Sequence, residues 1–181
     1  MIIDKDKEQE SEKFHNIMKM IQENEDAGMK EFYKEYGKFL CCVMRIFRGS
    51  SVTEQEILQE VLYVIWRNSK SPKFIENPKG WLYKITVNCA KGLLRARRVE
   101  YSLNENIVAK RNEIDDFLDR DEFDYLTRNL SVYEKQIVIK KVLAGDSFKE
   151  IAKDLKARNG SISTTYYRAL KKIEKDLRKN F

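Results

Sequence analysis

One predicted helix combines basic side chains with an amide and carries no acid. Residues 79–98 include six basic and no acidic side chains. Five polar residues in this stretch follow one another at helical steps of four and three: Lys84, Asn88, Lys91, Arg95 and Arg98. They therefore share one face of the helix. Lysine and arginine neutralise phosphates and asparagine hydrogen-bonds base edges, so this face suits nucleic acid, with a merely solvated basic face as the alternative.

The C-terminal segment predicts two helices around a tight turn. FKEIAKDLK (148–156) and SISTTYYRALKKIEKDLRK (161–179) flank the four residues 157–160. The expected inner contacts join Ile151, Ala152 and Leu155 to Ile162, Tyr166, Ala169 and Ile173. The expected outward residues are Ser163, Thr164, Tyr167, Arg168, Lys171 and Lys175. This pattern is typical of a helix-turn-helix whose second helix enters the major groove, although an ordinary helical hairpin shares much of it.

A third predicted helix, 53–68, has an acidic face. Glu56, Gln59, Glu60 and Tyr63 lie opposite the apolar Ile57, Val61, Val64 and Ile65. An acidic face repels DNA but can bind a basic protein surface. A solvated face is the simpler interpretation of this pattern alone.

Residue types needed for enzyme chemistry do not occur in useful combinations. The sequence has no glycine-rich phosphate loop and no Ser/His/Asp set, and His15 is its one histidine. Cys41, Cys42 and Cys89 lack metal-ligand spacing, so we expect helix-core thiols. We therefore predict neither catalysis nor a cofactor nor a metal. The charged N-terminus and the lack of a long apolar run predict a cytoplasmic location.

The elements that carry these faces are all helical. Glycine (7) and proline (2) are scarce, which favours helices over a sheet with many turns. Apolar spacing predicts helices over 15–24, 29–48, 53–68, 78–98, 131–145, 147–156 and from 161 onward, with a loop over 69–77. Capping boxes mark three starts, at Thr53/Glu56, Ser131/Glu134 and Ser147/Glu150. Asn77 followed by Pro78 marks a fourth.

The distribution of charge predicts two domains. Residues 113–124 carry one basic and seven acidic side chains, and they separate the basic stretch 79–98 from the basic C-terminal part. Two separate basic surfaces indicate two polyanion-binding regions. We predict an all-α protein with two small helical domains, 15–98 and 123–181, joined by a flexible acidic linker over 99–122.

These motifs resemble a known family. TEQEILQEVLYVIW (53–66) followed by PKGWLYKITVNCAKGLLRARR (78–98) resembles the first domain of extracytoplasmic-function sigma factors, within the sigma-70 family of bacterial RNA polymerase sigma factors. Residues 130–177 resemble the family's C-terminal helix-turn-helix, and residues 17–36 fit its opening helices. The resemblance covers most of the chain from about residue 17.

The resemblance implies a role for each face in promoter-specific initiation of transcription. The polymerase-binding residues would be Glu56, Leu58, Gln59, Glu60 and Leu62. The residues at the minus-ten element would be Tyr63, Trp66, Lys84, Asn88, Lys91 and Arg95. The loop 69–77 would capture a base flipped from that element. The residues at the minus-thirty-five element would be Ser161, Ser163, Thr164, Thr165, Arg168 and Lys171. Implied partners are core RNA polymerase, promoter DNA and an anti-sigma factor.

The sequence departs from the family pattern in the helix-turn-helix. The family often has glycine where Lys156 stands, and basic residues where Ser163 and Thr165 stand. Fewer charges predict weaker, less salt-dependent binding at the minus-thirty-five element. Two other functions fit the residues. One is a dimeric helix-turn-helix regulator that binds duplex DNA without polymerase, and the other is a helical adaptor for a basic partner.

Overall fold

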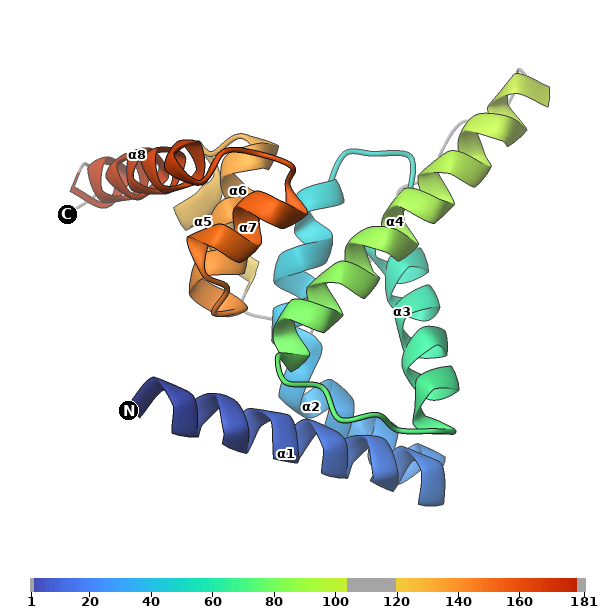
Figure 1. The fold of residues 1–181 in the computed structure, drawn as a ribbon. Coiled ribbons are helices and arrows are strands. Elements are labelled where there is room, and N and C mark those ends of the chain that lie inside the picture. The colour runs from blue at the N-terminus through green and yellow to red at the C-terminus, as the bar shows by residue number, and fades with distance from the viewer. Residues whose placement is uncertain (1, 104–119, 179–181) are drawn as a thin grey trace. The chain divides into compact units, whose positions relative to one another are not determined.

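The structure is a computed structural model that describes residues 2–103 and 120–178, with side chains over 7–98 and 123–178. Helices dominate these residues and no strand occurs among them (Figure 1), which confirms the predicted all-α fold. The contacts divide the chain into two units, Met1–Ile114 and Asp115–Phe181. The middle of the predicted acidic linker, 104–119, lies outside the described residues, so the linker and the predicted domain limits stay a prediction.

The described residues of unit 1, the N-terminal unit, form four long helices. They are α1 (Ile2–Glu23), α2 (Glu25–Met44), α3 (Glu54–Ser69) and α4 (Pro78–Leu103), with a short 3-10 turn, η1 (Arg45–Phe47), after α2. Both predicted start signals are present. Thr53 and Glu56 form the capping box of α3, and Asn77 Oδ1 accepts a hydrogen bond of 2.8 Å from Gly80 N–H at the start of α4.

An aromatic cluster fills the centre of unit 1. The Phe14 ring of α1 is fully buried and meets the Tyr36 ring edge-on at 5.4 Å and the Trp81 ring edge-on at 5.6 Å. Phe32 and Tyr36 of α2 are also buried. Large rings bury much apolar area and pack best edge-on, so this cluster holds α1, α2 and α4 together.

Helices α1 and α2 meet at a close crossing. Asn24 separates them and caps α2, accepting a hydrogen bond of 3.1 Å from Ala27 N–H. Four residues later, a Cβ at Gly28 would lie 2.3 Å from the backbone nitrogen of Ile21. Only glycine fits such an approach, so Gly28 lets the two backbones touch.

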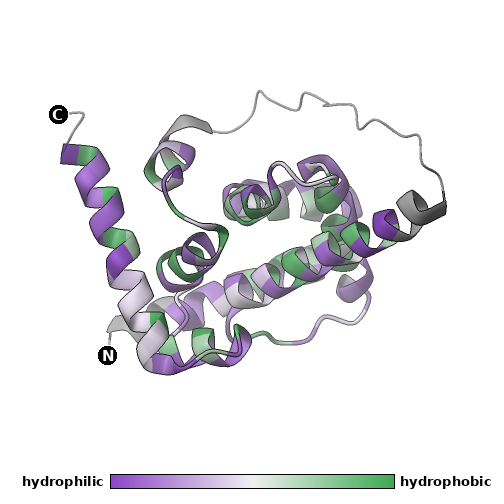
Figure 2. Ribbon diagram, turned by 90° about the horizontal axis from the view of Figure 1, so that it is seen from above, coloured by the Kyte–Doolittle hydropathy of each residue, from purple (hydrophilic) through white to green (hydrophobic). Residues whose placement is uncertain are grey.

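The described part of unit 2, the C-terminal unit, contains three short α-helices, a π-helical turn and one long α-helix. They are α5 (Arg120–Thr127), α6 (Val132–Val138), a π-helical turn η2 (Ile139–Leu143), α7 (Phe148–Asp154) and α8 (Asn159–Arg178). The predicted capping boxes at Ser131/Glu134 and Ser147/Glu150 are both formed. Figure 2 shows α8, the helix ending at the label C, as hydrophilic over most of its length with hydrophobic turns between.

The π-helical turn carries a buried ion cluster. Lys140 is fully buried, and its Nζ lies 2.6 Å from Asp146 Oδ2 and 2.8 Å from Asp154 Oδ2. Gly145 then takes a left-handed conformation with φ 68°, and Asp146 N–H donates to the Lys140 carbonyl at 3.0 Å. The cluster therefore ties η2 to the following loop and to α7.

Several helix ends differ from the predicted ones. Helix α1 begins at Ile2 rather than residue 15, and α4 continues to Leu103 rather than ending at Arg98. The extension of α1 is rich in charged helix formers, and neither extension contains glycine or proline. No helix breaker therefore stops either helix, although the apolar period is absent. Helix α8 begins at Asn159, inside the predicted turn. Over the part of the chain that the structure describes, no helix is long and apolar enough to cross a membrane.

Candidate nucleic-acid interface

The basic stripe of α4 is exposed along its whole length. The five stripe residues that share this exposure are Lys84, Asn88, Lys91, Arg95 and Arg98. The neighbouring apolar face is covered, since Leu82 is buried and Ile85, Cys89 and Leu93 are half-buried. The predicted division of this helix into a packed face and a basic face is therefore confirmed, and the stripe can reach a polyanion.

In the predicted acidic face of α3, Glu56 is bonded to other residues, whereas Gln59 and Glu60 are exposed. The Glu56 carboxylate accepts hydrogen bonds from Thr53 N–H at 2.7 Å and Thr53 Oγ1 at 2.8 Å, and its other oxygen pairs with Arg97 of α4. Burial alone would raise the pKa of Glu56, but the bonds from Thr53 and the Arg97 charge bring it below its usual value. Glu56 therefore joins α3 to α4.

The rest of the predicted protein-binding face remains on the surface. Gln59 and Glu60 are exposed, and Leu58 and Leu62 are half-buried beside them. Burial, followed by the negative charge of Glu60, raises the pKa of the Cys89 thiol on α4. Unit 1 therefore exposes Gln59 and Glu60 on the helix next to its basic stripe.

The predicted aromatic pair at the end of α3 is stacked. Tyr63 and Trp66 have ring centroids 5.9 Å apart at an interplanar angle of 28°. The Trp66 indole N–H donates to Glu25 Oε2 at 2.7 Å, and Lys70 Nζ lies 4.4 Å from the Trp66 ring centre. Trp66 is thus anchored to α2, while Tyr63 is 54% exposed.

A further exposed aromatic in unit 1 was not singled out from the sequence. Phe74, in the loop between α3 and α4, is 57% exposed. One edge of its ring meets His15 of α1, at 6.0 Å between centroids. Exposed Lys70 and Lys73 stand near it in the chain. An aromatic residue inside a polar, basic loop was the available signal, because such rings stack on unpaired bases.

Helices α7 and α8 of unit 2 pack as the helix-turn-helix pattern predicts. Ile151 and Ala152 of α7 form a core with Ile162 of α8 and Ile137 of α6, and Leu155 and Tyr166 lie against it. Contrary to the prediction, Ala169 and Ile173 do not belong to the core around Ile151 and Ala152. These two residues pack in a second cluster with Leu130 and Val138, because α8 continues past the short α7 and meets α6 instead.

The turn between α7 and α8 uses a residue that is rare in this conformation. Lys156 has a left-handed φ of 52°. Lys156 N–H donates to the Lys153 carbonyl at 3.3 Å, and Ala157 N–H donates to the Ala152 carbonyl at 2.9 Å. This is the Schellman pattern that closes helix ends, usually with glycine at this position. The lysine at the position where the resembling family has glycine therefore keeps the turn but adopts a strained backbone.

The outward side of α8 is polar and basic. Its exposed members are Ser161, Thr164, Tyr167, Arg168, Lys171 and Lys175, with Ser163 and Thr165 half-buried. The hydroxyls of Thr164 and Thr165 donate to the carbonyls of Gly160 and Ser161 at 2.9 and 2.8 Å. They remain able to accept hydrogen bonds. The predicted residues therefore share one accessible side of the helix.

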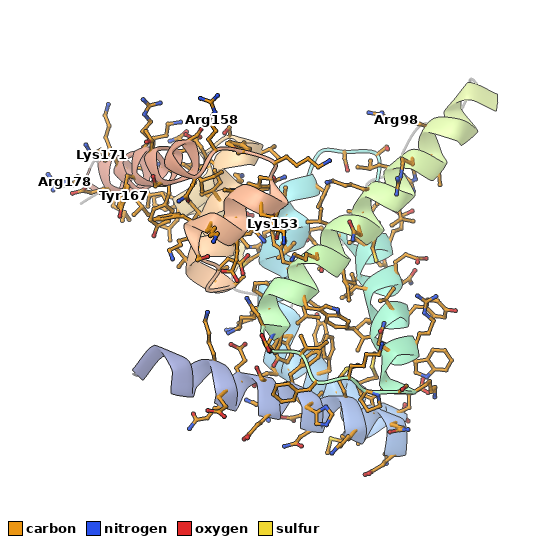
Figure 3. The ribbon with its side chains drawn as sticks, viewed as in Figure 1. Arg98, Lys153, Arg158, Tyr167, Lys171 and Arg178 are labelled. Carbon is orange, nitrogen blue, oxygen red and sulfur yellow. The ribbon has the colours of Figure 1, made fainter. Side chains whose placement is uncertain are left out.

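Basic residues outside α8 extend this surface. Lys149 and Lys153 of α7 and Arg158 of the turn are exposed. Figure 3 labels Lys153 on α7 and Arg158 before α8, with Tyr167, Lys171 and Arg178 along α8. In helix-turn-helix proteins the first helix crosses the phosphate backbone. The sequence analysis concentrated on α8, although the spacing of Lys149 and Lys153 by four residues was a usable signal.

A search for a metal site in the residues with described positions finds no group of three or more His, Cys, Asp or Glu side chains that could hold an ion. Cys41 is buried, and Cys42 and Cys89 are half-buried. Burial, with the charge of Glu54, raises the pKa of Cys41 to about 11. Comparison of the chain with protein-family models and with curated proteins gave no match to either.

Proposed function

We propose that the chain is a sigma factor of the extracytoplasmic-function type, which binds core RNA polymerase and directs it to promoters. The observation that carries the proposal is that two different surfaces lie on the contacting helices α3 and α4 of unit 1. One is the exposed basic stripe of α4, and the other is exposed Gln59 and Glu60 on α3 beside half-buried Leu58 and Leu62. A protein that only bound DNA would gain nothing from the exposed Glu60 carboxylate beside its basic stripe, since that charge repels phosphate. A protein that also binds a second protein partner has a use for it.

The proposed division of labour assigns one DNA element to each unit. In unit 1, the stripe residues Lys84, Asn88, Lys91 and Arg95 contact the minus-ten element, with Tyr63, Trp66 and the loop 69–77 beside it. In unit 2, the outward side of α8 contacts the duplex at the minus-thirty-five element. Lys149, Lys153 and Arg158 add phosphate contacts there, which offset the missing charges at Ser163 and Thr165.

Transcription of fragmented genomic DNA by core polymerase, with and without the chain, tests this function directly. The expected result is a set of run-off transcripts that depend on the chain and share sequence elements upstream of their starts. Transcripts that are identical with and without the chain refute the proposal. A dimeric regulator of duplex DNA would instead sediment as a dimer and bind DNA fragments without polymerase, so the same preparation distinguishes this alternative.

Charge reversal on α3 tests the polymerase-binding face. Glu60→Lys is expected to reduce capture of core polymerase, because it places a cation on the acidic surface. Glu23→Lys, an exposed glutamate at the end of α1, is the matched control and should leave capture unchanged. Equal capture by both variants and the wild-type chain contradicts the docking face.

Two substitutions test the DNA contacts separately. Asn88→Ala should cost about 1–3 kcal/mol of discrimination at one base of the minus-ten element if the amide makes a bidentate base contact. Arg168→Ala should weaken binding of the upstream duplex and reduce the dependence of that binding on salt. A minus-ten preference that does not change in the first variant, or an upstream footprint that does not change in the second, removes the corresponding role.

A further inference from the structure

Helix α1 lies along the loop that joins α3 to α4. Figure 1 shows this loop returning over α1 from the end of α3 to the start of α4. Three contacts connect them in antiparallel order. Gln22 Nε2 donates to the Lys70 carbonyl at 3.3 Å, the His15 and Phe74 rings meet at 6.0 Å, and Ser11 Oγ lies 2.7 Å from the Glu76 carbonyl.

The three residues of α1 share one helical face. Ser11, His15 and Gln22 are separated by four and seven residues, which places them one above another. Ser11 is 2% exposed, and its hydroxyl also lies 2.9 Å from the Lys7 carbonyl of its own helix. A polar group so deeply buried is retained where it has a hydrogen-bond partner, and here one partner is the backbone of the loop.

The end of the loop is fixed twice more. Glu10, next to Ser11, pairs with Lys79 of α4 through Oε1 and Nζ at 2.9 Å. Asn77 caps α4 through Gly80 N–H. The loop is therefore held at its start, its middle and its end, while the Phe74 ring stays 57% exposed. A ring on a backbone held in this way is pre-organised for stacking.

We propose that Ser11, His15 and Gln22 of α1 are positioning residues, which hold the loop so that Phe74 can stack on an unpaired nucleobase. This inference rests on the proposed function, because the unpaired base belongs to melted promoter DNA. It assigns to the N-terminal helix a part in recognition, although the stripe and the aromatic pair lie on α3 and α4.

Hydrogen–deuterium exchange of the full chain tests the positioning without any ligand. Ser11→Ala removes the hydroxyl and keeps a strong helix former in α1. We expect faster exchange of the amides of residues 71–76 and unchanged exchange in α2. Thr86→Val is the matched control, since it removes a buried hydroxyl of unit 1 that donates to the Leu82 carbonyl rather than to the loop. Unchanged exchange over 71–76 in Ser11→Ala overturns the proposal.

A double-mutant cycle separates positioning from general stability. The probe is a fluorescein-labelled oligothymidine, whose bases are unpaired. Ser11→Ala should weaken its binding about two- to tenfold, the value of one typical hydrogen bond. Phe74→Ala should weaken it as well, and Ser11→Ala should then have no further effect. Additive effects, or wild-type binding that Phe74→Ala leaves unchanged, overturn the proposal.

The sigma-factor proposal and the positioning role of α1 can be tested independently. If core polymerase makes the same transcripts with and without the wild-type chain, the sigma-factor proposal fails, whatever the exchange data show. If transcription depends on the chain but Ser11→Ala alters neither the exchange of residues 71–76 nor oligothymidine binding, only the role of α1 fails.

Discussion

The two units reach stability by different means. In unit 1, large rings from α1 and α2 are fully buried at the contact with α4, including Phe14, Phe32 and Tyr36. The described part of unit 2 buries no aromatic residue, and its core consists of aliphatic side chains and alanines. Its largest fully buried side chain is Lys140, paired with two aspartates. Unit 1 therefore buries large rings at its centre, whereas unit 2 packs a smaller aliphatic core beside a buried ion cluster.

This difference predicts which conditions change the stability of each unit. Burial of uncharged rings does not depend on pH, whereas paired charges such as the buried ion cluster of unit 2 respond to pH, and exposed pairs also respond to salt. The chain offers a way to observe the units separately, because Trp66 and Trp81 are its two tryptophans and both lie in unit 1. Tryptophan fluorescence therefore reports the unfolding of unit 1, and hydrogen exchange of α6 to α8 reports that of unit 2.

The largest effect is expected at the aromatic cluster. Phe14→Ala should destabilise unit 1 by about 3–5 kcal/mol, because it removes a buried ring and leaves a cavity between α1, α2 and α4. Urea denaturation followed by tryptophan fluorescence measures the loss, and exchange in α8 should not change. A fluorescence midpoint within error of the wild-type value would show that the cluster is not the centre of unit 1.

The equivalent test of unit 2 is Lys140→Met. Methionine fills a similar volume, but Asp146 and Asp154 lose their buried partner, so unit 2 should lose about 3 kcal/mol. Lys13→Met is the matched control on the surface of unit 1, where Lys13 pairs with Glu35 at half exposure. The control should cost under about 1 kcal/mol. Exchange of the α7 and α8 amides measures the first effect, and equal small effects in both variants would contradict the comparison.

A smaller effect concerns acid. Although burial of the Glu134 carboxylate would raise its pKa, hydrogen bonds from Lys172 at 2.7 and 2.9 Å and from the Ser131 cap bring the pKa below its usual value. A lowered pKa contributes stability above the unfolded value near 4.5, and that stability is lost as the pH falls through the folded value. Unit 2 should therefore weaken as the pH falls below about 4.5.

Glu134→Gln isolates this contribution. At neutral pH the variant should be less stable by about 1 kcal/mol, since a neutral amide is a weaker partner for Lys172. Its unit 2 should then lose less stability on acidification than the wild-type unit. Exchange of the α6 amides as a function of pH measures both. An acid response identical in the two proteins would assign the loss to other carboxylates.

The smallest expected effect is a gain in the stability of unit 2. Lys156→Gly should stabilise unit 2 by about 0.5 kcal/mol, because glycine adopts a left-handed φ without strain but adds freedom to the unfolded chain. Lys153→Gly, inside α7, is the control and should destabilise by about 1 kcal/mol. The exchange of α7 amides measures both, and a loss at position 156 would mean that the lysine side chain stabilises the turn.

Local signals predicted much of this architecture. The three capping boxes and the Asn77 cap depend on residues three apart in the chain, so the sequence alone indicates them, and all four are formed. The exposed stripe of α4 follows from the helical period in the same way. The second core of unit 2 was not predictable, because Ala169 meets Leu130 and Val138 only after α6 and α8 have packed.

Contacts of the candidate site between residues far apart in the chain were not predictable either. The engagement of Glu56 by Arg97 joins residues 41 positions apart, and no periodicity within one helix indicates it. The π-helical turn at Ile139–Leu143 was likewise missed, since its apolar spacing differs from that of an α-helix by one inserted residue. The contact of Ser11 with Glu76 spans 65 positions, and only the packed unit brings these two residues together.

The absence of a side chain at Gly28 has a mechanical consequence. At Gly28 the backbone of α2 lies against the backbone of α1 at Ile21, so a side chain at position 28 would force the two helices apart. Ser11 and His15 lie on the part of α1 that extends away from this close approach, and Gln22 lies next to Ile21. A single methyl group at position 28 would push α1 away from α2 and shift the contacts that α1 makes with the loop. The contacts of α1 with the loop thus depend on a residue that takes no part in them.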